Sequence, residues 1–225
     1  ILLFSLVSFL ALREFVTLAP TRPGDHRTLF WCFFVVMPLQ YYVIWIGWYG
    51  LFSILIPVWV SIFLAIRTAL SGDTESFLER MAINQWGLMI CVYFVSYTPA
   101  LLMLRIPGYE NQNAKLIFFL VLVVQLCDVL QYVWGKTIGK HRVAATVNPN
   151  KTWEGLVGGD VCATAVGTAI WWATPFRPVA AAAMASVLTV MGVGVGLIMS
   201  ATKRDRGDKD YGAIIQGHGG VLDRI

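Results

Sequence analysis

The feature that most constrains this chain is the spacing of its apolar residues. They form blocks of about 20 residues separated by short polar stretches, and a helix of ~20 apolar residues crosses the ~30 Å hydrocarbon core of a bilayer. Only 13% of the residues are charged and 57% are hydrophobic, whereas about 25% of the residues in a soluble domain are charged. We therefore predict an all-α, polytopic helical membrane protein rather than a lone soluble domain.

We expect seven membrane-spanning helices, of which the first is cut short. The chain opens inside an apolar block without an initiator Met and stops directly after a charged segment, so we expect a fragment truncated at both ends. The seven blocks cover residues 1–12, 30–48, 51–66, 86–104, 116–134, 156–174 and 179–199.

The positive charges support this span count and give an orientation. With strict alternation of the spans, 14 of the 17 Lys and Arg residues fall on one side, and only Arg105, Lys115 and Arg177 fall on the other. Lys and Arg concentrate on the cytoplasmic side of membrane proteins, so we assign the rich side to the cytoplasm. The two richest loops, residues 135–155 and 200–225, flank the sixth and seventh spans. We expect chemistry on a charged substrate there, and we expect no nucleic-acid partner.

The final segment, residues 200–225, interleaves cations, carboxylates and glycines. Anchoring alone would explain Lys203 and Arg204 as charges at the end of the last span. It does not explain the nearby aspartates, because acidic residues gain nothing as anchors at a membrane surface that is already negative. Carboxylates beside cations suit a Mg²⁺-phosphate site, where the metal takes one or two protein oxygens together with phosphate oxygens. The segment therefore predicts a site for a nucleotide or a phospholipid phosphate.

The same segment resembles a family signature. Its pattern S-x-x-K-R-x(4)-K-D-x-G-x(5)-H-G-G-x-x-D-R is similar to that of the phosphatidate cytidylyltransferases, the CDP-diacylglycerol synthases. The G-K-H run at 139–141 and the P-x-K-T-x-E-G run at 149–155 resemble the same family. We therefore expect residues 1–115 to form N-terminal membrane helices and residues 116–225 to form the catalytic region. The matching signature residues are Ser200, Lys203, Arg204, Lys209, Asp210, Gly212, His218, Gly219, Gly220, Asp223 and Arg224.

The resemblance implies an activity, a metal and residue roles. The phosphate of phosphatidate would attack the α-phosphorus of CTP and release pyrophosphate, with Mg²⁺ as cofactor, at the cytoplasmic face of a bacterial inner membrane. Because two anions must meet, the barrier is electrostatic and cations must line the site. The resemblance implies catalytic groups at Lys203, Arg204, Lys209, Asp210, His218 and Arg224, substrate contacts at Ser200, Lys140, Lys151, Gly219 and Gly220, and Mg²⁺ ligands at Asp128, Asp210 and Asp223.

Some of these assignments have structural alternatives. His218 suits a structural role equally well. Asp128, near the cytoplasmic end of the fifth span, suits an ion pair with Lys136 or Lys140, because a carboxylate inside a membrane is costly unless it is paired. The glycines within 155–159 favour close helix packing over ligand binding. A homodimer is left open.

Three departures from the family pattern indicate a divergent subfamily. Gly196 stands where family members carry the Asp of a G-D-L-x-E-S run, which is taken as a metal ligand. Gln216-Gly217 replaces Pro-Gly, and Cys127 replaces an Asn. One alternative to the enzyme is a weak or inactive paralogue that binds nucleotide or anionic lipid. The other is a transporter of a phosphorylated or lipid cargo that uses the same cations.

Overall fold

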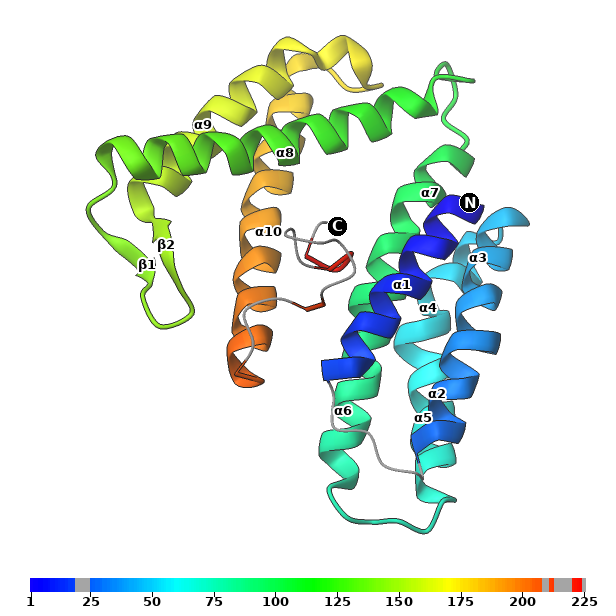
Figure 1. The fold of residues 1–225 in the computed structure, drawn as a ribbon. Coiled ribbons are helices and arrows are strands. Elements are labelled where there is room, and N and C mark those ends of the chain that lie inside the picture. Colours follow the sequence, from blue (N-terminus) through cyan, green and yellow to red (C-terminus); the bar gives the residue numbers. More distant parts are fainter. Residues whose placement is uncertain (19–24, 208–210, 213–219, 224–225) are drawn as a thin grey trace. The chain divides into compact units, whose positions relative to one another are not determined.

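The structure is a computed structural model, and it describes residues 1–18, 25–207, 211–212 and 220–223 (Figure 1). The chain forms two compact units. The first comprises residues 1–104 together with 210–225, and the second comprises residues 105–209. Each unit is described by itself. The functional division at residue 115 stays a prediction.

The first unit is a group of membrane-length helices (blue to green in Figure 1). It begins with α1, Leu2–Leu18. Three continuous helices follow, at His26–Trp45, Tyr49–Ala69 and Phe77–Met103. Each of the three is an α-helix interrupted by a wider π-helical segment. In the first of these helices, the π-helical segment Cys32–Val36 separates α2, His26–Trp31, from α3, Met37–Trp45. In the second, Leu55–Val60 separates α4, Tyr49–Ile54, from α5, Ser61–Ala69. In the third, Met89–Phe94 separates α6, Phe77–Leu88, from α7, Val95–Met103.

The π-helical segment in the middle helix is explained by its proline. Pro57 has no N–H to donate to the carbonyl of Ser53, four residues earlier. The Tyr93 hydroxyl donates to that carbonyl instead, at 2.7 Å. Nearby, the Gln40 amide donates to the Ser96 hydroxyl at 3.2 Å. Side chains from other helices therefore satisfy polar groups in the interior of this unit.

The second unit contains three long helices and a hairpin. The helices are α8 Asn113–Ile138, α9 Trp153–Ala169 and α10 Pro178–Asp205, and a short 3₁₀ turn, Trp171–Ala173, follows α9. Between α8 and α9 lie β1, Arg142–Ala144, and β2, Asn148–Thr152, which pair antiparallel with an irregularity after Arg142. This hairpin is the only sheet among the described residues.

Glycines bring α8 and α9 close together. A Cβ on Gly155 would lie 2.7 Å from the Gln131 carbonyl oxygen, and a Cβ on Gly159 would lie 2.9 Å from the Gln131 backbone nitrogen. A Cβ on Gly158 would lie 2.7 Å from the Trp134 ring. Such contacts are closer than real Cβ atoms make, so only glycine allows the backbones to approach this far. The expectation that these glycines serve helix packing is confirmed.

The prediction of an all-α membrane protein is confirmed. Five helices among the described residues are long and apolar enough to cross a membrane. The first and sixth expected spans correspond to α1 and α9, which have 17 residues each. On α10, Val179, Val187 and Met191 are 83%, 54% and 63% exposed. Apolar surface of this extent suits contact with lipid.

Candidate active site

In the second unit, the hairpin brings a lysine next to the seventh expected span. Asn148 on β2 donates from Nδ2 to the Ser200 hydroxyl on α10 at 3.4 Å. The same hydroxyl donates to the Gly196 carbonyl at 2.8 Å. A Cβ on Gly196 would lie 3.2 Å from Lys151 Nζ. Two expected substrate contacts, Lys151 and Ser200, therefore lie along the same stretch of α10.

A carboxylate orders the loop that carries Lys140. Glu154 Oε2 accepts the backbone N–H groups of Lys140 and His141, at 3.1 and 3.2 Å. Glu154 Oε1 lies 2.5 Å from His141 Nδ1. Thr152 directly precedes α9, and its hydroxyl accepts the Gly155 N–H at 3.2 Å and so caps the helix. The T-x-E run of the sequence therefore has a structural purpose, because it fixes both the start of α9 and the turn at Lys140.

These hydrogen bonds change the acidity of Glu154. The bond to the His141 side chain is the largest cause, and the backbone N–H groups of Glu154 itself, Lys140 and His141 add to it, so the pKa of the Glu154 carboxyl falls from 4.5 to about 2. Hydrogen bonds to a carboxylate favour its charged form. Glu154 is therefore ionised at neutral pH and keeps its hydrogen bonds to the loop.

The next expected cations lie in the last turn of α10. Lys203 is half-buried and Arg204 is exposed there. Cations are favourable at this end because the helix dipole is negative at the C-terminus. The local structure therefore suits both the phosphate-binding and the anchoring interpretation of these residues.

Asp128 is exposed on α8 and forms no ion pair within the described part of the chain. The alternative pairing with Lys136 or Lys140 is not found. Lys136 instead donates to the Tyr132 hydroxyl at 2.9 Å.

Asp160 is a carboxylate to which the sequence analysis gave no role. It lies on α9, where it accepts a short hydrogen bond from the Thr189 hydroxyl of α10. Thr189 is buried. The pair joins two membrane helices, which is a role that hydropathy does not reveal.

The end of the signature belongs to the first unit. Asp223 Oδ2 accepts the backbone N–H groups of Tyr211 and Gly220, at 2.9 and 3.0 Å. Asp223 therefore organises its own turn. The remaining expected site residues lie outside the described residues: Lys209, Asp210, His218, Gly219 and Arg224.

A residue that no sequence pattern indicated also contacts this turn. Glu14, near the end of α1, is 3% exposed. Its Oε1 accepts the Val221 N–H and its Oε2 accepts the Leu222 N–H, both at 2.8 Å. The available signal was a carboxylate two residues after the first apolar block, beside Arg13. Its partners lie 207 and 208 residues away in the sequence, which hid the contact.

The described residues contain no group of three or more His, Cys, Asp or Glu side chains placed to hold a metal ion. A nucleotide-bound Mg²⁺ requires less, because phosphates and water supply most of its ligands and one or two protein carboxylates suffice. Asp128 is exposed and lacks an ion-pair partner among the described residues, so it fits that requirement.

Comparisons with known proteins identify a family for this chain. The family model described as "Cytidylyltransferase family" matches residues 1–225. The uncharacterized protein YnbB of Escherichia coli (strain K12) is 36% identical over 223 residues, covering 99% of this chain and 72% of YnbB. A phosphatidate cytidylyltransferase of Staphylococcus saprophyticus is 30% identical over 234 residues, covering 100% of this chain and 84% of the relative. One of Mycobacterium leprae is 35% identical over 164 residues, covering 71% of this chain and 50% of the relative.

Proposed function

Because the chain belongs to the cytidylyltransferase family, we propose that it transfers the cytidylyl group of CTP to phosphatidate, giving CDP-diacylglycerol and pyrophosphate. Two similar proteins, 30% and 35% identical, carry the name phosphatidate cytidylyltransferase. We further propose that the protein lies in a bacterial inner membrane with its site facing the cytoplasm. The excess of Lys and Arg in alternate loops supports that orientation.

The observation that carries the proposal is the basic hairpin beside α10. The Lys151 ammonium lies next to Gly196, and Asn148 holds the hairpin to Ser200. A cation on a backbone held in this way needs less reorganisation to meet a phosphate, and preorganised charge is the largest contribution to catalysis in many enzymes. Glu154 orders the backbone at Lys140, which adds a second cation near the hairpin.

The reaction needs orientation and charge more than it needs a base. The attacking phosphate of phosphatidate is already ionised, so no proton must be removed from it. Lys151, Lys203 and Arg204 would reduce the repulsion between the two anionic substrates and hold the α-phosphate in line with the nucleophile. Ser200 would donate a hydrogen bond to a phosphate oxygen once its hydroxyl turns away from the Gly196 carbonyl.

Mg²⁺ is proposed as the cofactor, with Asp128, Asp210 and Asp223 as the carboxylates that would hold it. When bound, it would neutralise charge on the triphosphate and on the departing pyrophosphate. Asp128 supports this assignment because it is an exposed carboxylate without an ion pair among the described residues.

The proposal is tested in membranes that contain the expressed protein. They are incubated with CTP labelled in the cytidine, phosphatidate and Mg²⁺, and the lipid is then extracted. Label in the lipid fraction supports the enzyme. Label that accumulates unchanged inside sealed vesicles indicates a transporter, and bound label without conversion or uptake indicates an inactive paralogue.

A pair of lysine variants sharpens this assay. Lys151→Gln should reduce lipid labelling about tenfold or more, because hydrogen bonds to charged groups contribute about 1.5–3 kcal/mol. Lys115→Gln is the matched control, because Lys115 is exposed in the first turn of α8 and its ammonium donates to the nearby Gln112 side chain at 2.7 Å. Equal rates in the two variants would contradict the assigned role of Lys151.

A further inference from the structure

Glu14 is a buried acid that makes strong contacts outside its own helix. Its carboxylate is 3% exposed, and a buried carboxylate is unfavourable unless it is hydrogen-bonded. The successive N–H groups of Val221 and Leu222 bond to its two oxygens separately, both at 2.8 Å. Successive backbone N–H groups that converge on one anion form a nest, and such charge-assisted bonds are the stronger class. Glu14 therefore fixes the direction of this piece of backbone (red in Figure 1).

The two glycines of the signature that are described lie against the same carboxylate. A Cβ on Gly220 would lie 2.7 Å from Glu14 Cδ, and a Cβ on Gly212 would lie 3.1 Å from Glu14 Oε1. Any larger residue at Gly220 would displace the carboxylate or the turn. Glycine at these two positions therefore leaves room for the Glu14 carboxylate.

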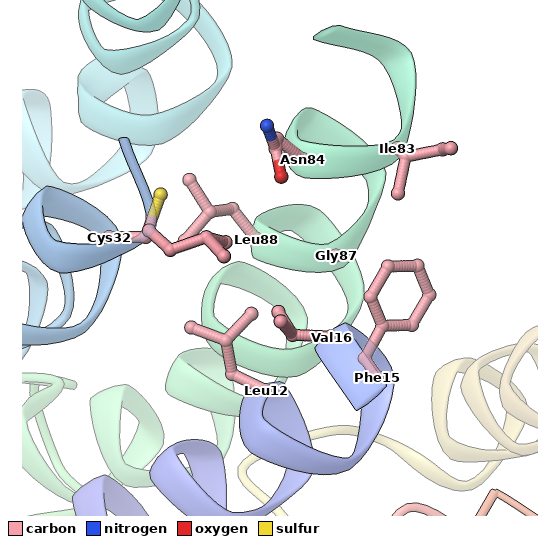
Figure 2. A pocket seen from close by; sticks show the side chains of 9 residues that line it. Leu12, Phe15, Val16, Cys32, Ile83, Asn84, Gly87 and Leu88 are labelled. Carbon is pink, nitrogen blue, oxygen red and sulfur yellow. The ribbon is translucent and has the colours of Figure 1, made fainter. Parts of the chain in front are cut away.

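The packing of α1 against its neighbours also restricts the Glu14 carboxylate. The next residue, Phe15, is 6% exposed and packs on α6, where a Cβ on Gly87 would lie 2.7 Å from the Phe15 ring. Figure 2 shows Phe15 beside Gly87, with Leu12 and Leu88 lining a cavity of about 10 Å³. That volume holds one water molecule at most. The end of α1 is therefore tightly packed, and Glu14 has little freedom to move.

We propose that Glu14 is a positioning residue for cytidylyl transfer: it holds residues 220–222 of the signature in the conformation in which the signature acts on substrate. Asp223 holds the same turn through the N–H groups of Tyr211 and Gly220. Two carboxylates thus order one short stretch of backbone, one from within the signature and one from the first span. The inference rests on the proposed function.

The first test replaces the carboxylate with its amide. Glu14→Gln keeps the shape but turns one acceptor into a donor that faces a backbone N–H, so one of the two bonds is lost. We expect kcat for CDP-diacylglycerol formation to fall about tenfold or more, while KM for CTP changes less than about threefold. Glu79→Gln, an exposed change on α6 in the same unit, is the matched control and should leave both constants unchanged.

A second readout does not depend on activity. Hydrogen exchange followed by mass spectrometry should show faster exchange in the peptide that contains Val221 and Leu222 in Glu14→Gln, and unchanged exchange in Glu79→Gln. If wild-type membranes form no CDP-diacylglycerol, the proposed function fails, and the exchange experiment still tests the contact. Unchanged exchange in Glu14→Gln would overturn the contact. Faster exchange with an unchanged kcat would overturn the positioning role.

A double substitution separates positioning from general damage. Gly220→Ala places a methyl group on the Glu14 carboxylate and should reduce kcat in the wild-type background. In a Glu14→Ala background the carboxylate is gone, so the same change should reduce kcat further by less than about twofold. If the fold-losses in kcat of Gly220→Ala and Glu14→Ala multiply in the double variant, the two changes act independently and the proposal is overturned.

Discussion

Gly196→Asp restores the carboxylate that the family pattern has at this position, and the structure predicts that it impairs the protein. A Cβ on Gly196 would lie 3.2 Å from Lys151 Nζ, so a carboxylate there would form an ion pair with Lys151. The position does not serve close helix packing, because within the described part of the chain Lys151 Nζ is the only atom from outside this helix that would lie within 4 Å of that Cβ. The new aspartate would therefore compete with the substrate phosphate for the ammonium.

The size of the effect follows from the loss of the contact between Lys151 and the substrate phosphate. A charge-assisted hydrogen bond contributes about 1.5–3 kcal/mol, and each 1.36 kcal/mol corresponds to a tenfold change. We expect kcat/KM for CTP to fall about 10- to 150-fold. Unfolding should not cause the loss, because glycine is itself a poor residue in a helix interior and its replacement changes helix propensity by less than about 1 kcal/mol.

The assay is the CTP-dependent labelling of lipid, measured with Gly196→Asp and with Gly196→Asn as the uncharged control of similar shape. The asparagine variant should stay within about threefold of wild type, because an amide does not neutralise Lys151. Adding Lys151→Gln to Gly196→Asp should cause little further loss, since both changes remove the same interaction. Higher turnover or a tighter Mg²⁺ requirement in Gly196→Asp would refute this reasoning and indicate an under-ligated metal site.

Three further outcomes are expected. Asp223→Asn should abolish turnover while the protein still inserts in the membrane, because an amide replaces a hard anionic oxygen; near-normal rates would remove Asp223 from the proposed Mg²⁺ ligands. Arg204→Lys keeps the positive charge but loses the bidentate fork, so it should impair substrate use about tenfold without altering topology measured by cysteine labelling; wild-type kinetics would return Arg204 to an anchoring role. Glu154 has a pKa of about 2, below its usual 4.5, so its stabilisation of the Lys140 turn is complete above pH 4.5 and lost as the pH falls through 2. The difference in thermal stability between wild type and Glu154→Gln should shrink over that interval, and a constant difference would contradict the assignment.

The membrane helices could be predicted from the sequence because each one depends on local composition. Among the described residues, the apolar blocks correspond to the five helices long enough to cross a membrane and to the two 17-residue helices α1 and α9. The glycines within 155–159 indicated the close packing of α8 and α9. The resemblance also selected Lys151 and Ser200, which the structure places along one stretch of α10. These features follow from hydropathy, from the spacing of small residues or from a local pattern.

The parts that were missed depend on contacts between distant segments. The partner of the Ser53 carbonyl is one example, because the Tyr93 hydroxyl that donates to it belongs to a different helix. Glu14 reads as an isolated acid until its partners 207 and 208 residues away are known. The link from Asp160 to Thr189 likewise crosses between helices. Hydropathy contains no information about which side chain meets which backbone group.

The hydrogen bond from Tyr93 to the Ser53 carbonyl bears on how the protein is made. An unsatisfied carbonyl in hydrocarbon costs several kcal/mol, and Pro57 removes the usual donor, four residues on, for the Ser53 carbonyl of the Tyr49–Ala69 helix. When the Tyr49–Ala69 helix is synthesised, the Phe77–Met103 helix that carries Tyr93 does not yet exist. The bond to the Ser53 carbonyl can form only after both helices have been made, so this polar group acquires its side-chain partner late in assembly.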